Sequence, residues 1–261
     1  MSRRRALLVA AAGIVAAGVL AGLPRASGSA GDVRDRDGIV YRYYAGYGYR
    51  FQPLLSFAEL NRLVSTRDAG AVRRLASALL ARGVRTTGGL VWQYDFPYAG
   101  GPSVWTSGFT QAVAAEALAR AALLLDDDSL LPPANDALHA LRSSLVMPLG
   151  GGLWIREYGY TDQVILNAQL QSVIALEAYA RIAATAAAVD TAASLYVAAA
   201  NLLPRFDLGC WSRYSLGGAA ATRSYHTYHV ELLARLSTLH RKDPIWHATY
   251  LDWSSCLAST S

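Results

Sequence analysis

The segment Arg223-Ser-Tyr-His-Thr-Tyr-His-Val230 concentrates side chains that can transfer protons or bind metals. It places two histidines and two tyrosines within residues 225–229, although the whole chain has only five histidines. His226 and His229 are three residues apart, so on a helix they would face the same side. Three interpretations fit: a pair of metal ligands, a catalytic group, or the polar start of an ordinary helix.

The metal interpretation lacks partners for these histidines. The H-E-x-x-H pairing of zinc proteases is absent, and no cysteine or third histidine lies nearby with ligand spacing. The chain also has no G-x-S-x-G nucleophile motif, no P-loop, and no dinucleotide-binding G-x-G-x-x-G between a strand and a helix. We therefore expect neither a metal ion nor a cofactor.

Paired carboxylates could support glycoside hydrolysis. Glu157 and Asp162 are near each other in the sequence, whereas Glu116, Asp95 and Asp207 lie close to glycine-rich segments. Sequence spacing does not select a pair among them. Hydrolysis therefore remains an alternative.

Tyrosines carry the remaining chemistry, and the chain has 15 of them. A phenol can donate a proton, or accept one when neighbouring groups lower its pKa. Tyr158, Tyr214 and Tyr225 each follow a polar or charged residue. The competing interpretation is that these tyrosines only pack against apolar neighbours.

The elements that must position these residues are mostly helices. Apolar spacing and capping residues predict helices over residues 57–64, 69–81, 107–125, 133–147, 162–185, 191–202, 225–240 and 245–256. Three inserts that join glycine to aromatic residues, 87–96, 150–158 and 207–215, resemble short hairpins. Paired helices alternating with such inserts predict a mainly α fold, a partial (α/α) toroid whose hairpin tips gather at one rim.

The N-terminal part divides into two segments before this domain. Arg3-Arg4-Arg5 precedes an apolar run over residues 6–23, and small residues follow up to Ala30, which is typical of a signal peptide. An uncleaved membrane anchor is the alternative. Residues 31–54 are rich in Tyr and Gly and predict an extended arm, and residues 55–261 are expected to form the toroid domain, which would carry any catalytic site. The domain should lie outside the cytoplasm, secreted or anchored.

The charge of the chain argues against a nucleic-acid partner. Four of the 24 Lys and Arg residues lie in the first thirty positions, and the remaining 20 face 19 Asp and Glu. A nucleic-acid footprint requires a concentrated basic face. Cys210 and Cys256 are the only cysteines. An exported location permits a disulfide between them, but two buried free cysteines are an equal alternative.

Six segments, in this order along the chain, resemble the C-terminal catalytic domain of D-glucuronyl C5-epimerases. They are Trp105-Thr-Ser-Gly-Phe-Thr-Gln111, Trp154-Ile-Arg-Glu-Tyr158, Val164-Ile-Leu-Asn-Ala168, Leu203-Pro-Arg-Phe-Asp207, Trp211-Ser-Arg-Tyr-Ser215 and Ser224-Tyr-His-Thr-Tyr-His-Val230. The resemblance covers roughly residues 85–255. It implies an (α/α) toroid that converts glucuronic to iduronic acid units in heparan-type or heparosan-like polysaccharides, without a redox cofactor.

The resemblance also implies roles for individual residues. The catalytic groups would be Glu157, Tyr158, Tyr214 and Tyr225. Substrate contacts would come from Trp105, Gln111, Arg156, Asn167, Arg213, His226 and His229, with Arg156 and Arg213 as candidates for the substrate carboxylate. Epimerisation removes a proton next to a carboxylate and returns one on the opposite face, so it requires two proton-transfer groups.

The chain departs from the family pattern at two positions beside the Glu-Tyr pair. Arg156 occupies the place of a second acidic residue, and Gly159 the place of a proline. A uronate lyase would begin with the same proton abstraction, so it remains an alternative, as does a glycan-binding module without catalysis. The oligomeric state is not predicted.

Overall fold

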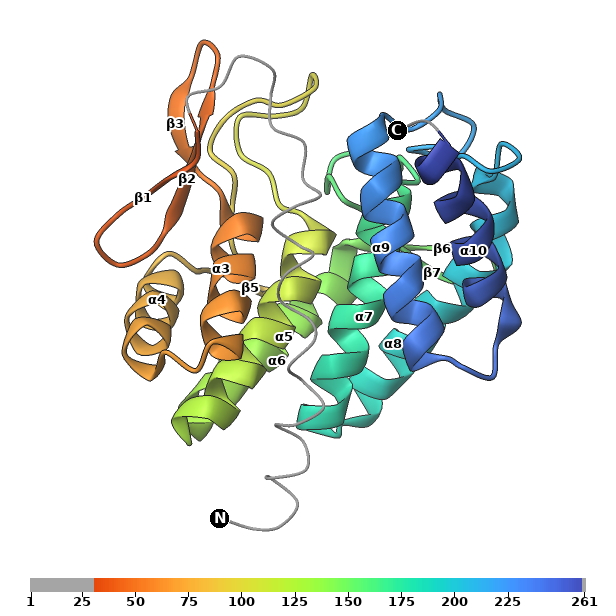
Figure 1. Ribbon diagram of the computed structural model, residues 1–261. Coiled ribbons are helices and arrows are strands. Elements are labelled where there is room, and N and C mark those ends of the chain that lie inside the picture. The colour runs from red at the N-terminus through yellow and green to blue at the C-terminus, as the bar shows by residue number, and fades with distance from the viewer. Residues whose placement is uncertain (1–30, 260–261) are drawn as a thin grey trace.

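The computed structural model describes residues 31–259, and the expected signal peptide lies outside them (Figure 1). Within this range eight helices form four antiparallel pairs. The inner helices, which contact one another in sequence order, are α3 (Pro53–Ser65), α5 (Gly108–Leu125), α7 (Leu166–Ala183) and α9 (Arg223–Leu239). The outer helices are α4 (Ala69–Ala81), α6 (Leu131–Ser144), α8 (Ala186–Leu202) and α10 (Pro244–Ser259). This arrangement is a partial (α/α) toroid, as expected.

The inner helices α5 and α7 lack the polar face of an ordinary surface helix. Every residue from Gly108 to Ala122 in α5, and from Leu166 to Leu176 in α7, is buried. A mostly apolar helix with no solvent-facing polar side belongs in a core. By length and composition α5 and Ala186–Phe206 could each span a membrane, but 83% of α5 is buried inside the protein. Burial among other helices explains its apolar composition.

Local sequence signals set most helix boundaries. The Asp68 side chain accepts a hydrogen bond from the Ala71 amide and caps α4, and Ser107 caps α5 through the Thr110 amide. Several boundaries differ from expectation: α3 begins at Pro53 rather than at residue 57, and α8 begins at Ala186 rather than at residue 191. The helix expected over 133–147 ends at Ser144, because Val146 and Met147 pair in a strand, and the helix expected from residue 162 begins at Leu166.

Two of the three expected hairpins are present. β4 (Val84–Thr86) pairs with β5 (Gly89–Val91), and β6 (Val146–Leu149) pairs with β7 (Gly152–Ile155), both antiparallel. The third insert forms only isolated bridges: Asp207 with Ser212, Arg213 with Ala220, and Ser215 with Ile165. Two short 3-10 helices, η1 (Asp128–Leu130) and η2 (Leu203–Phe206), complete the connections.

The Tyr/Gly-rich segment folds as a small sheet rather than as a single extended arm. β1 (Val33–Arg34), β2 (Val40–Tyr44) and β3 (Gly48–Phe51) form an antiparallel sheet in that order. α3 begins at Pro53, so the expected boundary between residues 54 and 55 falls inside this helix. The Val40 amide donates to the Ser56 hydroxyl of α3 at 2.9 Å and ties the sheet to the toroid.

The sheet and the loop that leads from β5 to α5 rise above the same end of the helices (Figure 1). At this end α5 begins after Ser107, and α3 begins after Gln52. The loops at this end carry most of the residues expected from the sequence to be catalytic or substrate-binding.

Candidate active site

A cavity of about 160 Å³ lies at this end of the molecule, bounded by the N-termini of three inner helices. Gln52 precedes α3, Ser107 precedes α5, and Tyr225 lies in the first turn of α9. Because a helix carries partial positive charge at its N-terminus, all three helices favour negative charge in the cavity. The volume suits one sugar residue.

Aromatic rings form most of the cavity wall. Trp105 stacks on Tyr94 with ring centroids 3.9 Å apart and an interplanar angle of 3°. Tyr98 lies 5.5 Å from Tyr158, centroid to centroid. The aromatic residues that line the cavity are Tyr44, Tyr94, Phe96, Tyr98, Trp105, Tyr158 and Tyr225. Flat apolar walls of this kind suit the faces of sugar rings.

Glu157 follows strand β7 and brings a carboxyl group into the cavity. Its Oε2 atom is fully enclosed and has no hydrogen-bond partner among the described residues. Burial raises the pKa of this carboxyl to about 7, and a hydrogen bond from Tyr158 opposes part of the shift. A carboxyl group with a pKa near neutrality can both accept and release a proton.

The phenols of Tyr158, Tyr214 and Tyr225 form a cluster beside Glu157. Rings 214 and 225 lie 4.5 Å apart, centroid to centroid. Burial raises the pKa of all three phenols, and the negative charge of Glu157 raises each further. They therefore stay protonated and act as donors. Tyr214 does not line the cavity but lies behind Tyr225, where its hydrogen bond lowers the pKa of Tyr225.

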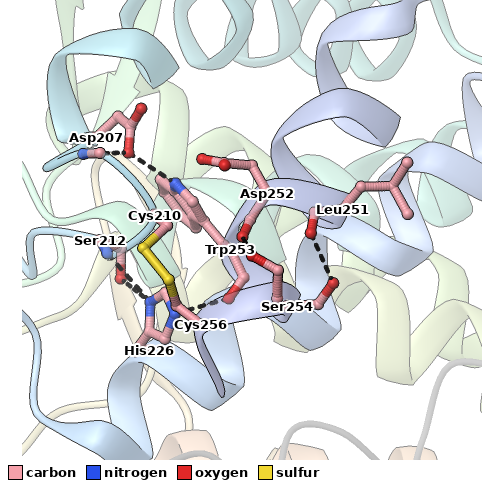
Figure 2. Close-up of a disulfide and its surroundings, with 11 residues drawn as sticks. Asp207, Cys210, Ser212, His226, Leu251, Asp252, Trp253, Ser254 and Cys256 are labelled. Atoms are coloured by element: carbon pink, nitrogen blue, oxygen red, sulfur yellow. Dashed lines mark hydrogen bonds between the residues drawn. A yellow bond between two sulfur atoms is a disulfide. The ribbon is translucent and has the colours of Figure 1, made fainter. Parts of the chain in front are cut away.

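His226 and His229 are fully buried and hold the loop that carries Tyr214. The Ser212 hydroxyl lies 2.9 Å from Nδ1 of His226 and 2.7 Å from Nδ1 of His229. Nε2 of His226 lies 3.2 Å from the carbonyl oxygen of Trp253 in α10 (Figure 2). Burial lowers the pKa of both rings, that of His229 to about 3, so both are neutral at physiological pH.

The segment between Asp207 and Ser212 is held against α10 by a covalent bond as well. Cys210 and Cys256 form a disulfide, which settles the alternative that the sequence left open (Figure 2). Beside it the Asp207 carboxylate accepts a hydrogen bond from the indole of Trp253 at 2.9 Å. The disulfide and the histidines together fix this segment to α9 and α10.

Several residues expected to contact substrate do not line the cavity. Gln111 is buried and donates to the Leu90 carbonyl at 2.6 Å. Arg156 donates to Asp162 at 2.7 Å, and Arg213 donates to the Gly218 carbonyl at 2.6 Å. Trp105 does line the cavity.

Asn167, which is expected to bind substrate, is enclosed in the first turn of α7. It is 1% exposed, and its Oδ1 and Nδ2 atoms have no hydrogen-bond partner among the described residues. It is not among the residues that line the cavity.

The N-terminal sheet supplies cavity residues that sequence reasoning missed. Arg42 and Tyr44 of β2 and Gln52 after β3 all line the cavity. The Tyr/Gly/Arg composition of residues 41–49 was the available signal, but it indicated only packing. Within residues 31–259 no group of three or more His, Cys, Asp and Glu side chains is arranged to hold a metal ion.

Comparison with known protein families decides where this chain belongs. Residues 87–255 match the family model described as D-glucuronyl C5-epimerase C-terminus. The chain is a member of this family. The match contains Glu157 and the three clustered tyrosines, whereas the residues that the N-terminal sheet adds to the cavity precede it. No curated protein sequence matches the chain.

Three solved structures of similar fold are glycoside hydrolases. A GH8 endo-β-1,4-glucanase from an Achatina fulica gut metagenomic library superposes with a TM-score of 0.56 at 17% identity, covering 81% of this chain and 70% of that chain. The family 8 glycosyl hydrolase Cel10 from Klebsiella pneumoniae gives 0.55 at 15% identity, with 81% and 76% covered. Endo-β-1,4-glucanase CMCax from Acetobacter xylinum gives 0.53 at 13% identity, with 80% and 74% covered. These likenesses concern the fold alone.

Proposed function

We propose that this epimerase-family chain converts D-glucuronic to L-iduronic acid residues within a polysaccharide by proton transfer at C5. The observation that carries the proposal is the pairing, in one cavity, of Glu157 with neutral tyrosines. The pKa of Glu157 is raised to about 7 by burial, which suits a proton acceptor at neutral pH.

The proton balance of the reaction uses two groups. Glu157 takes the C5 proton, and the electron pair of the broken C–H bond moves into the substrate carboxylate. Tyr225 then donates its proton to the other face of C5 and becomes a phenolate. Tyr214 donates a hydrogen bond to Tyr225, which stabilises that phenolate. Exchange of protons with water restores both groups before the next turnover.

The N-termini of α3, α5 and α9 assist abstraction of the C5 proton, because they are already oriented toward the cavity before the reaction. Negative charge builds up on the substrate carboxylate when the C5 proton leaves. Partial positive charge at three helix ends, already oriented toward the cavity, stabilises such charge more than it stabilises the resting substrate.

Hydrolysis, the reaction of the solved structures named above, is less well supported. It normally requires two carboxyl groups around the scissile bond. Among the described residues that line the cavity, Glu157 is the one acid. Of the other candidates, Glu116 is buried beside Arg120 and Asp207 binds Trp253. Asp95 pairs with Arg50, and Asp162 pairs with Arg156.

Incubation with heparosan-like polymer in heavy water tests the proposal. The wild-type protein should introduce deuterium at C5 of the uronic acid, together with iduronate signals in the proton NMR spectrum of the polymer. A lyase would instead produce an unsaturated uronate that absorbs in the ultraviolet, with shorter chains. Binding without exchange or cleavage would indicate a glycan-binding module. No deuterium in any uronate polymer would refute both proton-abstraction reactions.

The Tyr225→Phe variant tests the assignment of the donor. The change conserves volume, so thermal unfolding should stay close to that of the wild type. Net epimerisation should fall by roughly 100- to 10,000-fold, while Glu157 can still exchange the C5 proton on its own face. Unchanged epimerisation would make Tyr225 a packing residue.

We also propose export of the protein. The basic and apolar start of the sequence supports this, and the Cys210–Cys256 disulfide is consistent with an oxidising compartment. Reporter fusions to residues 1–30 would test it, and a reporter retained in the cytoplasm would contradict it.

A further inference from the structure

The small N-terminal sheet is built firmly into the cavity wall. The ring of Tyr44 packs on that of Phe96 with centroids 4.1 Å apart. Its hydroxyl accepts a hydrogen bond from Nε2 of Gln52 at 2.6 Å, and Gln52 is 8% exposed. These contacts join the sheet to the loop before α5, so its residues occupy defined positions around a bound molecule.

Arg42 of β2 brings a positive charge to this wall. Its side chain is 13% exposed and lines the cavity. Nε and Nη2 donate to the two carboxylate oxygens of Asp32 at 2.8 and 2.9 Å, which fixes the plane of the guanidinium group. Burial raises the pKa of Tyr225, and the charge of Arg42 opposes a small part of that rise, so the guanidinium lies within electrostatic reach of Tyr225.

Arg156 and Arg213, which the resemblance assigns to the substrate carboxylate, do not line the cavity. Arg156 donates to Asp162 and to the Ser144 carbonyl. Arg213 donates to a carbonyl of its own loop. Among the described residues that line the cavity, Arg42 is the one with a positively charged side chain.

A second polar group on the same wall points to a ligand. Oε1 of Gln52 is buried and has no hydrogen-bond partner among the described residues, although Gln52 lines the cavity. A buried polar atom without a partner is costly unless something binds it. A sugar hydroxyl would satisfy it while the carboxylate of the same sugar meets Arg42.

We infer that Arg42 recognises the carboxylate of the substrate uronate and selects uronic acids over neutral sugars. A guanidinium group carries five N–H donors, and two of those of Arg42 bind Asp32. Its positive charge attracts a carboxylate in the cavity. The inference rests on the proposed function for its substrate class. It also assigns a substrate-recognition role to the N-terminal sheet, which lies outside the family match at residues 87–255.

The experiment compares binding of heparosan with binding of heparosan whose carboxyl groups have been reduced to alcohols. Titration calorimetry of the full chain should show that the wild type prefers the carboxylated polymer. Arg42→Gln should weaken binding of that polymer by roughly 10- to 100-fold and leave binding of the reduced polymer nearly unchanged. Arg42→Lys keeps the positive charge but lacks the planar guanidinium group, so its affinity for the carboxylated polymer should lie between those of the wild type and Arg42→Gln.

Arg85→Gln is the matched control. Arg85 also lies on a strand and pairs with an aspartate, Asp136 at 2.8 Å, but it does not line the cavity. Its variant should retain the wild-type preference, and thermal unfolding of each variant verifies its fold.

Three outcomes would overturn the inference. In the first, Arg42→Gln keeps the wild-type preference for the carboxylated polymer. In the second, a folded Arg213→Gln variant loses that preference while Arg42→Gln keeps it. In the third, the wild type binds the two polymers equally well. Failure of the proposed function is a separate result. A wild type that prefers the carboxylated polymer through Arg42, yet never exchanges C5 deuterium, would refute epimerisation and leave the role of Arg42 standing.

Discussion

At the scale of single residues, the surroundings of Glu157 and of the three tyrosines set which group accepts a proton and which groups donate one. The same burial that raises the pKa of Glu157 to about 7 raises the pKa of Tyr158, Tyr214 and Tyr225 well above neutrality. The carboxyl group therefore ionises near neutral pH, whereas the three phenols stay protonated there. This difference assigns acceptor and donor roles.

The pKa of Glu157 predicts how activity depends on pH. Glu157 must be ionised to accept the C5 proton, so the exchange rate should rise as pH increases through about 7 and then level off. The donor phenols stay protonated, so no fall follows until strongly alkaline pH. Initial rates of deuterium incorporation between about pH 5 and about pH 9 check this. A rate that falls through pH 7 would give Glu157 the role of a proton donor instead.

The departure at Gly159 has a local structural reason. Its amide donates to the Thr106 carbonyl at 2.8 Å, a bond that proline could not make. A Cβ atom there would lie 2.9 Å from the same carbonyl oxygen. The loop after the Glu-Tyr pair therefore packs closely on the segment before α5.

At the scale of elements, the start of α5 sets the position of the strand end that carries Glu157. The Gly108 amide donates to the Arg156 carbonyl at 2.8 Å. A Cβ atom on Gly108 would lie 2.6 Å from the Leu145 carbonyl oxygen and 2.8 Å from that of Arg156. There is no space for a methyl group between α5 and the end of β7.

Substitution Gly108→Ala should therefore reduce both stability and activity. We expect the free energy of unfolding to fall by about 1–3 kcal/mol, because the backbone before Glu157 must move. Denaturant unfolding and the exchange assay measure the two effects. As a control, Gly46→Ala would meet no atom within 4 Å, although its positive φ adds some strain. If Gly108→Ala were as stable as the wild type, the packing between the start of α5 and the end of β7 would not be rigid.

The disulfide should matter to the element that carries Tyr214. Cys210 and Cys256 are 46 residues apart, so the cross-link restricts the unfolded chain. Replacing both by serine should lower the free energy of unfolding by about 2–4 kcal/mol. Reducing agent should destabilise the wild type to a similar extent and leave the double variant unchanged. If reducing agent also destabilised the double variant, its effect on the wild type could not be assigned to the Cys210–Cys256 disulfide.

The sequence predicted the helices better than it predicted the cavity. Asp68, Ser107 and the alanine-rich runs are local signals, and they set helix boundaries to within a few residues. The cavity depends on contacts between distant segments, such as Tyr44 with Phe96, and no local pattern encodes them. The Glu-Tyr pair was found through family resemblance, and Arg42 only through the fold.

At the scale of the whole molecule, a buried polar network joins the inner helices. Arg120 of α5 donates to Oδ1 of Asn61 in α3 at 2.7 Å and lies 3.5 Å from Glu116. Arg235 of α9 lowers the pKa of Glu116, opposing the upward effect of burial. Because these charges lie among apolar helices, the network favours one relative placement of α3, α5 and α9.

Removing one charge from this network should be strongly destabilising. Arg120→Met would leave the Glu116 carboxylate buried without its nearest cation, and the free energy of unfolding should fall by about 3–5 kcal/mol. Arg85→Met, which breaks an exposed pair, should change it by less than about 1 kcal/mol. Denaturant unfolding of both variants compares them directly. Equal effects would mean that the network contributes no more than a surface pair.

The central claim is that Glu157 abstracts the C5 proton of a uronic acid in this cavity. The most direct measurement is the C5 deuterium content of heparosan-like polymer recovered from heavy water after incubation with wild type or with Glu157→Gln. Glutamine conserves the volume of the side chain, so the fold should be retained. We predict deuterium with the wild type and a rate lower by roughly 100- to 10,000-fold with the variant. Equal deuterium incorporation by the two proteins would contradict the account.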